Sequence, residues 1–523
     1  MNSTDTPLPN VLELLYSSKQ WINRDWLILG KGPSFSLFRN DYSNAFYILT
    51  LNDSIREVKK ATIAHFIDFD AFERNSGSLH HAQFVVLPWF PHFNHKVGTQ
   101  SLAELSLSDS ALAQLAAENR LYWYDLNTST VRHGSYPVLS ASFFSAEAAL
   151  DLLATAGVKR IRSLGIDGGN SYSAEFSDLS NVSLLSNGWK NFDRQFSSFA
   201  KVIARTGVDY APLDMDAPVR IYVASTASEA LPVEVLEYSI KQHASATASV
   251  IPLWGAGISI PKPQAPKNQP RTPFSFQRFL IPQVCGYEGR AIYLDSDMLV
   301  FKDIVNLWRR PFGEANVLAA YSDSASGRKP QFSVMLMNCS QLKWNIQDIV
   351  DQLDSGALSY EQLMYDFSLA RTSAVIEPEW NSLEIFKPGQ TALLHYTDMN
   401  TQPWVSHLNP LGYLWVRSLR QAIQDGAISR SFVEDEVQKG HVRPSLLYQL
   451  DHDIEDAILL PASALALDAG FSPPYRALTA HRASPWKNRL IWLRAVLRSQ
   501  YQKTPLYKFE RRILCSLKAR LER

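Results

Sequence analysis

The sequence predicts an α/β protein, with two successive α/β domains followed by a helical and basic tail. With 523 residues the chain is too long for one ordinary hydrophobic core, so two or three domains are expected. A short apolar run at Trp26–Leu29 opens the first domain, and a second such run at Val219–Ala224 follows the turn-like sequence D-M-D-A-P. We therefore expect domains over residues 1–212 and 213–425, and a helical extension over residues 426–523.

The composition is that of a globular protein in a reducing compartment. Hydrophobic residues make up 46% and charged residues 20% of the chain, unlike a disordered sequence. Lys plus Arg and Asp plus Glu both number 51, so the net charge argues neither for nor against binding of nucleic acid. We expect no nucleic-acid partner. Cys285, Cys339 and Cys515 are far apart and odd in number, so neither a disulfide framework nor a zinc site is expected. The first residues lack a signal-peptide pattern and no apolar run approaches the ~20 residues of a membrane span, which predicts a cytoplasmic protein.

A glycine-rich turn follows the first apolar run. The sequence G-K-G-P-S at Gly30–Ser34 lies between the predicted strands Trp26–Leu29 and Ala45–Leu51. Glycines let the backbone come close to phosphate oxygens, and backbone N–H groups can bind them. The pattern indicates a Rossmann-like nucleotide-binding domain, although a tight turn after a strand explains the same glycines equally well.

Further along, a helical pattern at Ser145–Gly157 precedes the strand-like sequence V-K-R-I-R-S-L-G-I-D-G-G, which begins at Val158. Acid and glycine at the carboxyl end of such a strand lie where parallel sheets bind ligands. Together these segments resemble the MptE-like and family 42 sialyltransferase group over about residues 20–205. The resemblance implies a nucleotide pocket lined by Gly30, Gly32, Pro33, Ser34 and Asn52, with Asp167 nearby.

The histidines of the first domain depart from that group. Its sialyltransferases carry a catalytic histidine after the G-I-D segment, but this chain has none between His133 and His243. Sialyl transfer by this domain is therefore left open. His80, His81 and the histidines of Pro88–His95 are interpreted as surface-loop residues in preference to pocket residues.

The sequence R-A-I-Y-L-D-S-D-M-L-V-F, Arg290–Phe301, carries the most informative motif of the second half. Asp295 and Asp297 lie between two apolar runs, where burying bare charges is costly. A divalent cation removes that cost, and oxygen ligands suit Mg²⁺ or Mn²⁺. The same spacing recurs at Asp68/Asp70, Asp214/Asp216 and Asp451/Asp453, without a strand before and an apolar run after.

This motif resembles the D-x-D segment of glycosyltransferase family 8, whose members have the GT-A fold. The sequence L-L-H-Y-T-D-M-N-T-Q-P-W, Leu393–Trp404, resembles the segment of that family that supplies a third metal ligand. The resemblance covers about residues 219–425. It implies that Asp295, Asp297 and His395 hold Mn²⁺ (or Mg²⁺) against the diphosphate of a nucleotide sugar, with a UDP-sugar as the expected donor.

The resemblance implies further site residues. A lysine that contacts the diphosphate is usual where Gln402 stands, so Lys387 or Arg278 is the candidate to replace that charge. The residues expected at the nucleotide are Thr226, Arg278, Ser296 and Gln402, and those expected at the reacting centre are Glu361 and Gln362.

The last part of the chain is basic. Residues 487–523 contain eleven Lys and Arg against two Glu, a net charge of 11 − 2 = +9. Apolar residues recur there at helical spacing, which is typical of helices that bind anionic membrane surfaces. The alternative is a solvated helix whose apolar face packs on its own domain.

The combined prediction is a metal-dependent, retaining glycosyltransferase on the inner face of the cell membrane. It would move a hexose to a glycan or lipid-linked acceptor of the bacterial surface-polysaccharide type. Two alternatives stay open at this point. The N-terminal domain could be the working enzyme, a nucleotide-dependent transferase or pyrophosphokinase. The chain could also be a non-catalytic nucleotide- or glycan-binding protein.

Overall fold

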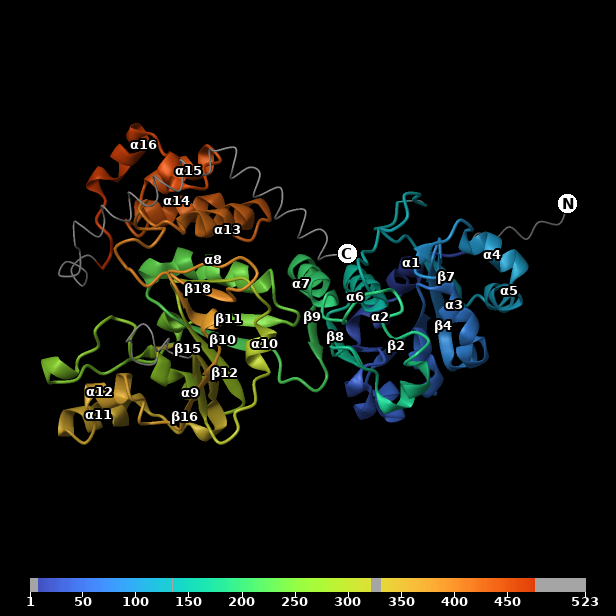
Figure 1. The fold of residues 1–523 in the computed structure, drawn as a ribbon, viewed down its shortest axis with the longest axis horizontal. Coiled ribbons are helices and arrows are strands. Elements are labelled where there is room, and N and C mark those ends of the chain that lie inside the picture. The colour runs from blue at the N-terminus through green and yellow to red at the C-terminus, as the bar shows by residue number, and fades with distance from the viewer. Residues whose placement is uncertain (1–7, 134, 321–330, 476–523) are drawn as a thin grey trace. The chain divides into compact units, whose positions relative to one another are not determined.

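The computed structural model describes residues 8–133, 135–320 and 331–475, and confirms the predicted α/β class (Figure 1). Contacts divide the chain into two compact units. Unit 1 is Met1–Val219 with Lys241–Ala248, and unit 2 is Arg220–Ile240 with Ser249–Arg523. The predicted boundary after residue 212 lies close to this division. The predicted basic tail, residues 487–523, lies outside the described residues.

Unit 1 is built on a seven-stranded parallel sheet of order β7-β4-β3-β2-β1-β8-β9. Its strands are β1 (Trp26–Leu29), β2 (Tyr47–Leu51), β3 (Ala61–His65), β4 (Ala82–Pro88), β7 (Leu121–Tyr124), β8 (Arg160–Leu164) and β9 (Asp209–Pro212). The chain steps outward from β1 to β7 and then returns to place β8 on the other side of β1. Loops that leave β1 and β8 therefore run in opposite directions, and ligands bind at such a switch point in open α/β sheets.

Both faces of this sheet are buried. Trp26 and Ile28 of β1 pack into a core with the helices α1 (Val11–Tyr16), α6 (Ser145–Thr155) and α7 (Gln195–Thr206). Leu27 and Leu29 point to the opposite core, which includes α3 (Phe69–Arg74), α4 (Leu102–Ser108) and α5 (Ser110–Ala117). Burial on both faces explains why the strands read as continuous apolar runs. The short elements α2 (Lys19–Asn23), β5 (His92–Phe93) and β6 (Lys96–Val97) complete the unit.

Unit 2 contains a six-stranded mixed sheet of order β11-β10-β12-β15-β14-β16. Its strands are β10 (Val219–Ala224), β11 (Ala248–Pro252), β12 (Arg290–Asp295), β14 (Val317–Ala320), β15 (Gln331–Asn338) and β16 (Thr372–Ile376). A separate three-stranded sheet joins β13 (Met298–Val300), β18 (Leu393–His395) and β17 (Ser382–Leu383) in that order. The apolar run at Val219–Ala224 forms β10, and the two apolar runs that flank Asp295 and Asp297 form β12 and β13.

Helices cover unit 2 on two sides. The helices α8 (Ala230–Lys241), α13 (Gly412–Gln424), α14 (Arg430–Gln438) and α15 (Ser445–Asp451) share one apolar core with β13 and β18. Figure 1 shows α13 to α16 (Ala462–Ala466) gathered beside α8. A second core joins β12 and β15 with α9 (Ile281–Val284), α11 (Ile346–Ser355) and α12 (Tyr360–Met364). The short helix α10 (Val305–Trp308) follows β13.

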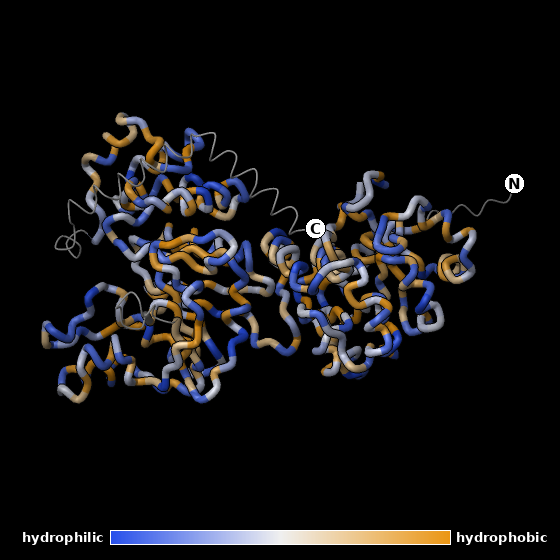
Figure 2. The backbone as a smooth tube through the Cα atoms, viewed as in Figure 1, coloured by the Kyte–Doolittle hydropathy of each residue, from blue (hydrophilic) through white to orange (hydrophobic). Residues whose placement is uncertain are grey.

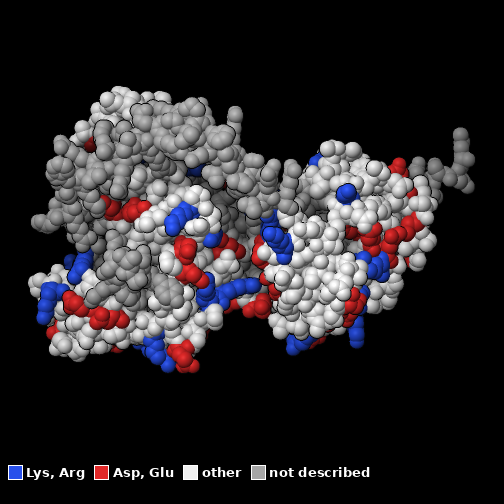
Figure 3. Space-filling view, viewed as in Figure 1, with Lys and Arg blue, Asp and Glu red and all other residues white. Residues whose placement is uncertain are grey.

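The chemistry of the surface agrees with the balanced composition. Hydrophobic segments are frequent in the interior of each unit, and hydrophilic segments are frequent at the periphery (Figure 2). On the visible face of each unit, Lys and Arg are interspersed with Asp and Glu (Figure 3). Among the described helices, none is both long and apolar enough to cross a bilayer.

Candidate active site

The pairing of β13 with β18 brings the two predicted motifs of unit 2 together. Strand β12 ends at Asp295, the chain turns through Ser296 and Asp297, and Met298 of β13 then lies directly opposite His395 of β18. The N–H of Tyr396 donates to the carbonyl oxygen of Asp297 at 2.8 Å, which extends the pairing to the turn. His395 is therefore fixed beside both aspartates.

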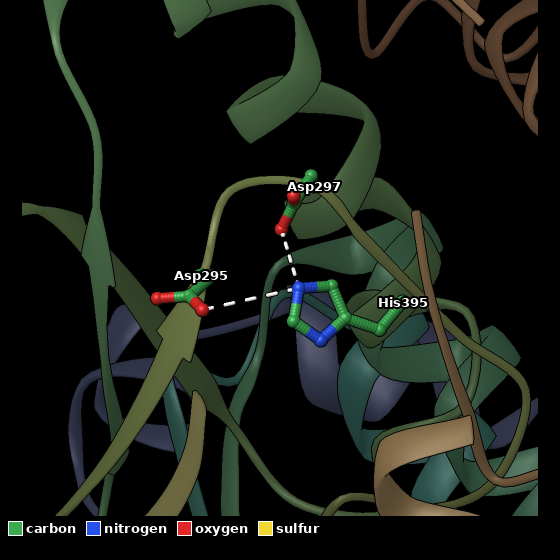
Figure 4. Close-up of side chains that lie close together, drawn as sticks. All are labelled: Asp295, Asp297 and His395. Carbon is green, nitrogen blue, oxygen red and sulfur yellow. Dashed lines mark ion pairs between the residues drawn. The ribbon is translucent and has the colours of Figure 1, made fainter. Parts of the chain in front are cut away.

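The three side chains converge on one point (Figure 4). Nε2 of His395 lies 3.0 Å from Oδ1 of Asp297 and 3.9 Å from Oδ2 of Asp295. One ligand atom from each residue lies within 4.8 Å of the others, a cluster that suits a metal ion. As the sequence predicted, Asp295, Asp297 and His395 meet at the carboxyl end of β12.

The remaining polar atoms of these side chains are held by neighbours. The hydroxyl of Tyr293 donates to Oδ1 of Asp295 at 2.6 Å, and the amide of Gln402 donates to Oδ2 of Asp297 at 2.8 Å. Each carboxylate thus presents its other oxygen to His395. The buried Oδ1 of Asp297 makes no other hydrogen bond among the described residues. Two free oxygens and one nitrogen form a donor set that fits Mn²⁺.

Asn381 sets the orientation of the imidazole. Oδ1 of Asn381 lies 2.9 Å from Nδ1 of His395, so it accepts the Nδ1 hydrogen and leaves Nε2 for a metal. Burial alone would lower the pKa of His395, but the charges of Asp297 and Asp295 outweigh burial and raise that pKa. The hydrogen bond to Asn381 and the attraction of the two carboxylates both keep the ring turned toward Asp295 and Asp297.

Arg278 lies beside this cluster. It donates to the carbonyl oxygen of Phe332 at 2.9 Å, its guanidinium stacks on the Tyr293 ring at 4.7 Å, and its Nη2 is 3.9 Å from Asp295. Its buried Nε has no hydrogen-bond partner among the residues that the structure describes. This places a cation with a spare donor next to the candidate metal site.

Sequence reasoning missed Glu229, a buried carboxylate behind the D-x-D turn. It accepts from the N–H of Thr226 at 2.9 Å, the Ser296 hydroxyl at 3.0 Å and the Tyr475 hydroxyl at 3.2 Å. Burial raises the pKa of Glu229 to about 7. The sequence T-A-S-E, in which Thr226 and Glu229 form a capping box, is the signal that could have found it. Thr226 and Ser296, predicted to contact the nucleotide, here hold this acid.

Two predicted residues make contacts that the sequence did not indicate. Gln402 is buried, and its amide nitrogen donates to Oδ2 of Asp297 and to the carbonyl oxygen of Tyr396, so it orients a candidate metal ligand. A contact of Gln402 with the nucleotide stays a prediction. Gln362 is exposed, and its side chain closes the N-terminal capping box of α12 with Ser359. Glu361 is likewise exposed on α12. A catalytic role for Glu361 and Gln362 stays a prediction.

Unit 1 has a cavity of about 740 Å³ at the carboxyl edge of its sheet. Gly30, Gly32 and Asn52 line it, as the sequence predicted, and Asp167 lies in its wall. Asn52 has a positive φ of 51°, which is uncommon for a residue other than glycine. Its Oδ1 is buried and has no hydrogen-bond partner among the described residues.

The glycines of G-K-G-P-S are needed for packing between two loops. A Cβ on Gly30 would lie 2.3 Å from the carbonyl oxygen of Gly165, and one on Gly32 would lie 2.5 Å from Oδ2 of Asp167. Ser34 closes the same contact, because its N–H donates to Asp167 and its hydroxyl accepts from the N–H of Gly165. Ser34 is thus a structural residue of the loop and does not line the cavity. At these positions the structure shows the close packing of a tight turn, and nucleotide binding by Gly30 and Gly32 stays a prediction.

Comparison with known proteins identifies part of the second unit. Residues 217–348 match the glycosyl transferase family 8 domain. The chain therefore contains a family 8 glycosyltransferase domain. This confirms the predicted family over residues 217–348 and the class of enzyme expected, while residues 349–425 of the predicted range lie outside the match. A comparison with curated protein sequences found no match.

Several solved structures resemble parts of the chain. The glycosyltransferase GlyE of Streptococcus pneumoniae TIGR4 is 18% identical with a TM-score of 0.27, over 40% of this chain and 64% of GlyE. The galactosyltransferase LgtC, in complex with donor and acceptor sugar analogues, is 12% identical with a TM-score of 0.28, over 40% of this chain and 96% of LgtC. The bifunctional glycosyltransferase WbbM is 10% identical with a TM-score of 0.31, over 80% of this chain and 99% of WbbM. This chain thus spans just under two thirds of the length of GlyE.

Proposed function

We propose that unit 2 is a metal-dependent glycosyltransferase that moves a hexose from a nucleotide diphosphate sugar, with a UDP-sugar as the expected donor. The acceptor would be a hydroxyl of a glycan or lipid-linked glycan. The observation that supports this most directly is the convergence of Asp295, Asp297 and His395 within a family 8 domain. Retention of the anomeric configuration is the stereochemistry that the family resemblance implies.

In this proposal each residue has a defined task. Oδ2 of Asp295, Oδ1 of Asp297 and Nε2 of His395 would hold Mn²⁺ or Mg²⁺, because these are the atoms that their neighbours leave free. The bound cation would supply positive charge to the departing diphosphate. Arg278 is the candidate for a second contact to that diphosphate, because its buried Nε lacks a partner and lies on the same side as Asp295.

Glu229 would serve as a support for the D-x-D turn. Two groups hold this turn: Glu229 accepts from the Ser296 hydroxyl, and Tyr396 donates its N–H to the carbonyl oxygen of Asp297. A carboxylate that accepts three hydrogen bonds is well placed to fix a turn whose side chains must stay aligned for the metal.

Unit 1 is proposed to bind a nucleotide. The supporting observation is a cavity at the switch point of a doubly covered parallel sheet, lined by Gly30, Gly32 and Asn52. Lys31 and Arg74 also line the cavity and would face the phosphates, although both now pair with Asp53. Membership of the MptE-like or family 42 group stays a prediction, and so do the cytoplasmic location and the membrane contact.

The membrane proposal has its own test. With a net charge of +9, residues 487–523 should bind anionic vesicles, and binding should weaken with salt because surface attraction is screened over ~8–10 Å. The comparison is co-sedimentation of the full chain and of a chain that ends at residue 486. Equal sedimentation of the two would reject membrane binding through this segment.

The enzymatic proposal is tested by nucleotide release from a panel of nucleotide sugars, with Mn²⁺, with Mg²⁺ and with chelator. Asp297→Asn keeps the shape of the side chain but removes one ligand charge, so metal-dependent turnover should fall ~10²–10³-fold. Asp453→Asn is the matched control, since Asp453 belongs to an exposed D-x-D that pairs with Arg420. The proposal fails if the two variants lose the same activity, or if chelator leaves turnover unchanged.

A further inference from the structure

A group of titratable side chains outside the metal centre lines the cavity of unit 1. Asp68 and Asp70 follow β3, and His92 and His95 belong to the small hairpin of β5 and β6. No local pattern in the sequence connects them, because the D-x-D at Asp68 lacks the apolar run that marks Asp295. The structure places all four in the wall of one cavity.

The ring of His95 lies between the carboxylate of Asp68 and the hydroxyl of Ser186, which also lines the cavity. Nδ1 of His95 lies 3.5 Å from Oδ1 of Asp68, and Nε2 of His95 lies 2.9 Å from the hydroxyl oxygen of Ser186. Oδ1 of Asp68 is buried and makes no hydrogen bond of normal geometry with the described residues. One ring nitrogen therefore faces a carboxylate, and the other lies at hydrogen-bond distance from the Ser186 hydroxyl, which itself donates to the carbonyl oxygen of Ser183 at 3.2 Å. The same order, in which a base is oriented by an acid, defines proton-accepting histidines in enzymes.

The hairpin turn fixes this arrangement at a cost in backbone energy. Asn94 and His95 both have positive φ, of 48° and 63°, as the two central residues of a tight hairpin between β5 and β6. The N–H of Asn94 donates to Oδ2 of Asp70 at 2.8 Å, which ties the turn to the start of α3. A histidine in the left-handed region is uncommon, and such strain is frequent at functional sites. Asp70 thus holds the turn while Asp68 faces the ring.

The electrostatics agree with a proton acceptor. The neighbouring Asp68 carboxylate raises the pKa of His95 above its usual value, the direction that makes the imidazole a stronger base. His92, on the neighbouring strand, has its pKa lowered by burial and bonds to Thr128 at 3.0 Å. The two pKa values are therefore shifted in opposite directions, and His95 is the stronger base of the two.

We propose that the cavity of unit 1 is a second transferase centre, in which His95, oriented by Asp68, accepts the proton of an acceptor hydroxyl while a nucleotide-linked sugar occupies the cavity. The proposal rests on the nucleotide binding proposed above for unit 1. The Ser186 hydroxyl marks the position that the acceptor hydroxyl would take. Asp68 acts through His95 and is a positioning residue.

The step balances without a further reactant. Nε2 of His95 takes the hydroxyl proton, and the oxygen electron pair forms the bond to the anomeric carbon of the sugar. The bond from that carbon to the phosphate oxygen breaks, and its electron pair leaves with the nucleotide. The products are the glycosylated acceptor, the nucleotide anion and an imidazolium, which returns its proton to solvent. In the absence of an acceptor, water takes the same place and the donor is hydrolysed.

The test uses the full chain with unit 2 disabled by Asp297→Asn, or by His395→Ala if the first variant does not fold. Calorimetry with UDP, GDP and CMP should show that this chain still binds a nucleotide. Nucleotide release from UDP-, GDP- and CMP-sugars should persist at a low rate. In that background, His95→Gly should lower release ~10²–10⁴-fold with nucleotide affinity unchanged. Glycine suits the positive φ at this position, and added imidazole should restore part of the rate.

Three further variants make the outcome decisive. Asp68→Asn should lower kcat and leave KM for the nucleotide sugar unchanged, as expected of a residue that orients a base. His80→Gly, on the helix η4 (Ser76–His81) and outside the cavity lining, is the matched control and should have no effect. Ser186→Ala should not reduce release, since the hydroxyl only occupies the acceptor position.

Several results would overturn the proposal. One is that the Asp297→Asn chain binds no nucleotide, or that it binds nucleotide without releasing any from the nucleotide sugars. Another is that the His95→Gly and His80→Gly variants release nucleotide at equal rates, or that imidazole fails to restore release by His95→Gly. Loss of release in Ser186→Ala would indicate a nucleophilic serine in place of acceptor activation. Failure of the proposed function of unit 2 is recognised separately, because wild type and Asp297→Asn would then show the same metal dependence.

Discussion

Asn381→Ala tests whether the metal site depends on how His395 is held. In the wild type, Asn381 accepts the Nδ1 hydrogen of His395 at 2.9 Å and leaves Nε2 free. Without that acceptor, the neutral ring would place its hydrogen on Nε2 and donate to Oδ1 of Asp297, 3.0 Å away. One hydrogen would then occupy two ligand atoms, and metal binding would first have to displace it.

The expected loss of Mn²⁺ affinity is about 10–100-fold, as is typical when the partner of a metal-bound histidine is removed. This equals about 1.4–2.8 kcal/mol, since each tenfold change is worth ~1.4 kcal/mol. The assay is titration of Mn²⁺ followed by the electron paramagnetic resonance signal of the free ion. Asn381→Asp keeps an acceptor at the same place and should restore most of the affinity. An affinity within twofold of wild type for Asn381→Ala would refute the reasoning.

Two predictions concern unit 1. Burial lowers the pKa of His65 from 6.5 to about 3. As the pH falls below 6.5, His65 therefore takes up a proton in the unfolded chain but not in the folded one, and the free energy of unfolding decreases. His65→Gln, which can still bond to Tyr124, should therefore reduce the stability difference between pH 7 and pH 5 by ~2 kcal/mol, measured by hydrogen exchange of β3 amides. Gly30→Ala should destabilise unit 1 by ~1–3 kcal/mol, because its Cβ would lie 2.3 Å from the backbone of Gly165, whereas Gly77→Ala meets nothing within 4 Å. Equal melting of the two alanine variants would contradict the packing role.

Local patterns in the sequence predicted the sheets and two of the metal ligands. Strand β12 is an apolar run that stops at Asp295, and such a run is recognisable because both faces of the strand are buried. His395 could be named only through the family resemblance, because nothing local reveals that β18 pairs with β13. The register of that pairing, with Met298 opposite His395, is a tertiary property.

The residues that sequence reasoning missed or misplaced are those whose role depends on distant partners. Gln402 and Asn381 were not recognised as supports, since each one acts on a side chain from another element. Asp68 served as a control for the metal motif. His95 was interpreted as a surface-loop residue, which agrees with its exposed side chain, but its place beside Asp68 was not predicted. Their proximity depends on a hairpin that folds back to α3, and the two left-handed residues at its turn have no clear sequence signature.

The most direct test of the account is to locate the metal. Crystals of the protein soaked with Mn²⁺ and a nucleoside diphosphate, measured at the manganese absorption edge, should show one strong anomalous peak in unit 2. The account predicts that this peak lies within bonding distance of Oδ2 of Asp295, Oδ1 of Asp297 and Nε2 of His395. A peak bound by the aspartates alone with His395 turned away, or a peak at another acidic pair, would contradict the account.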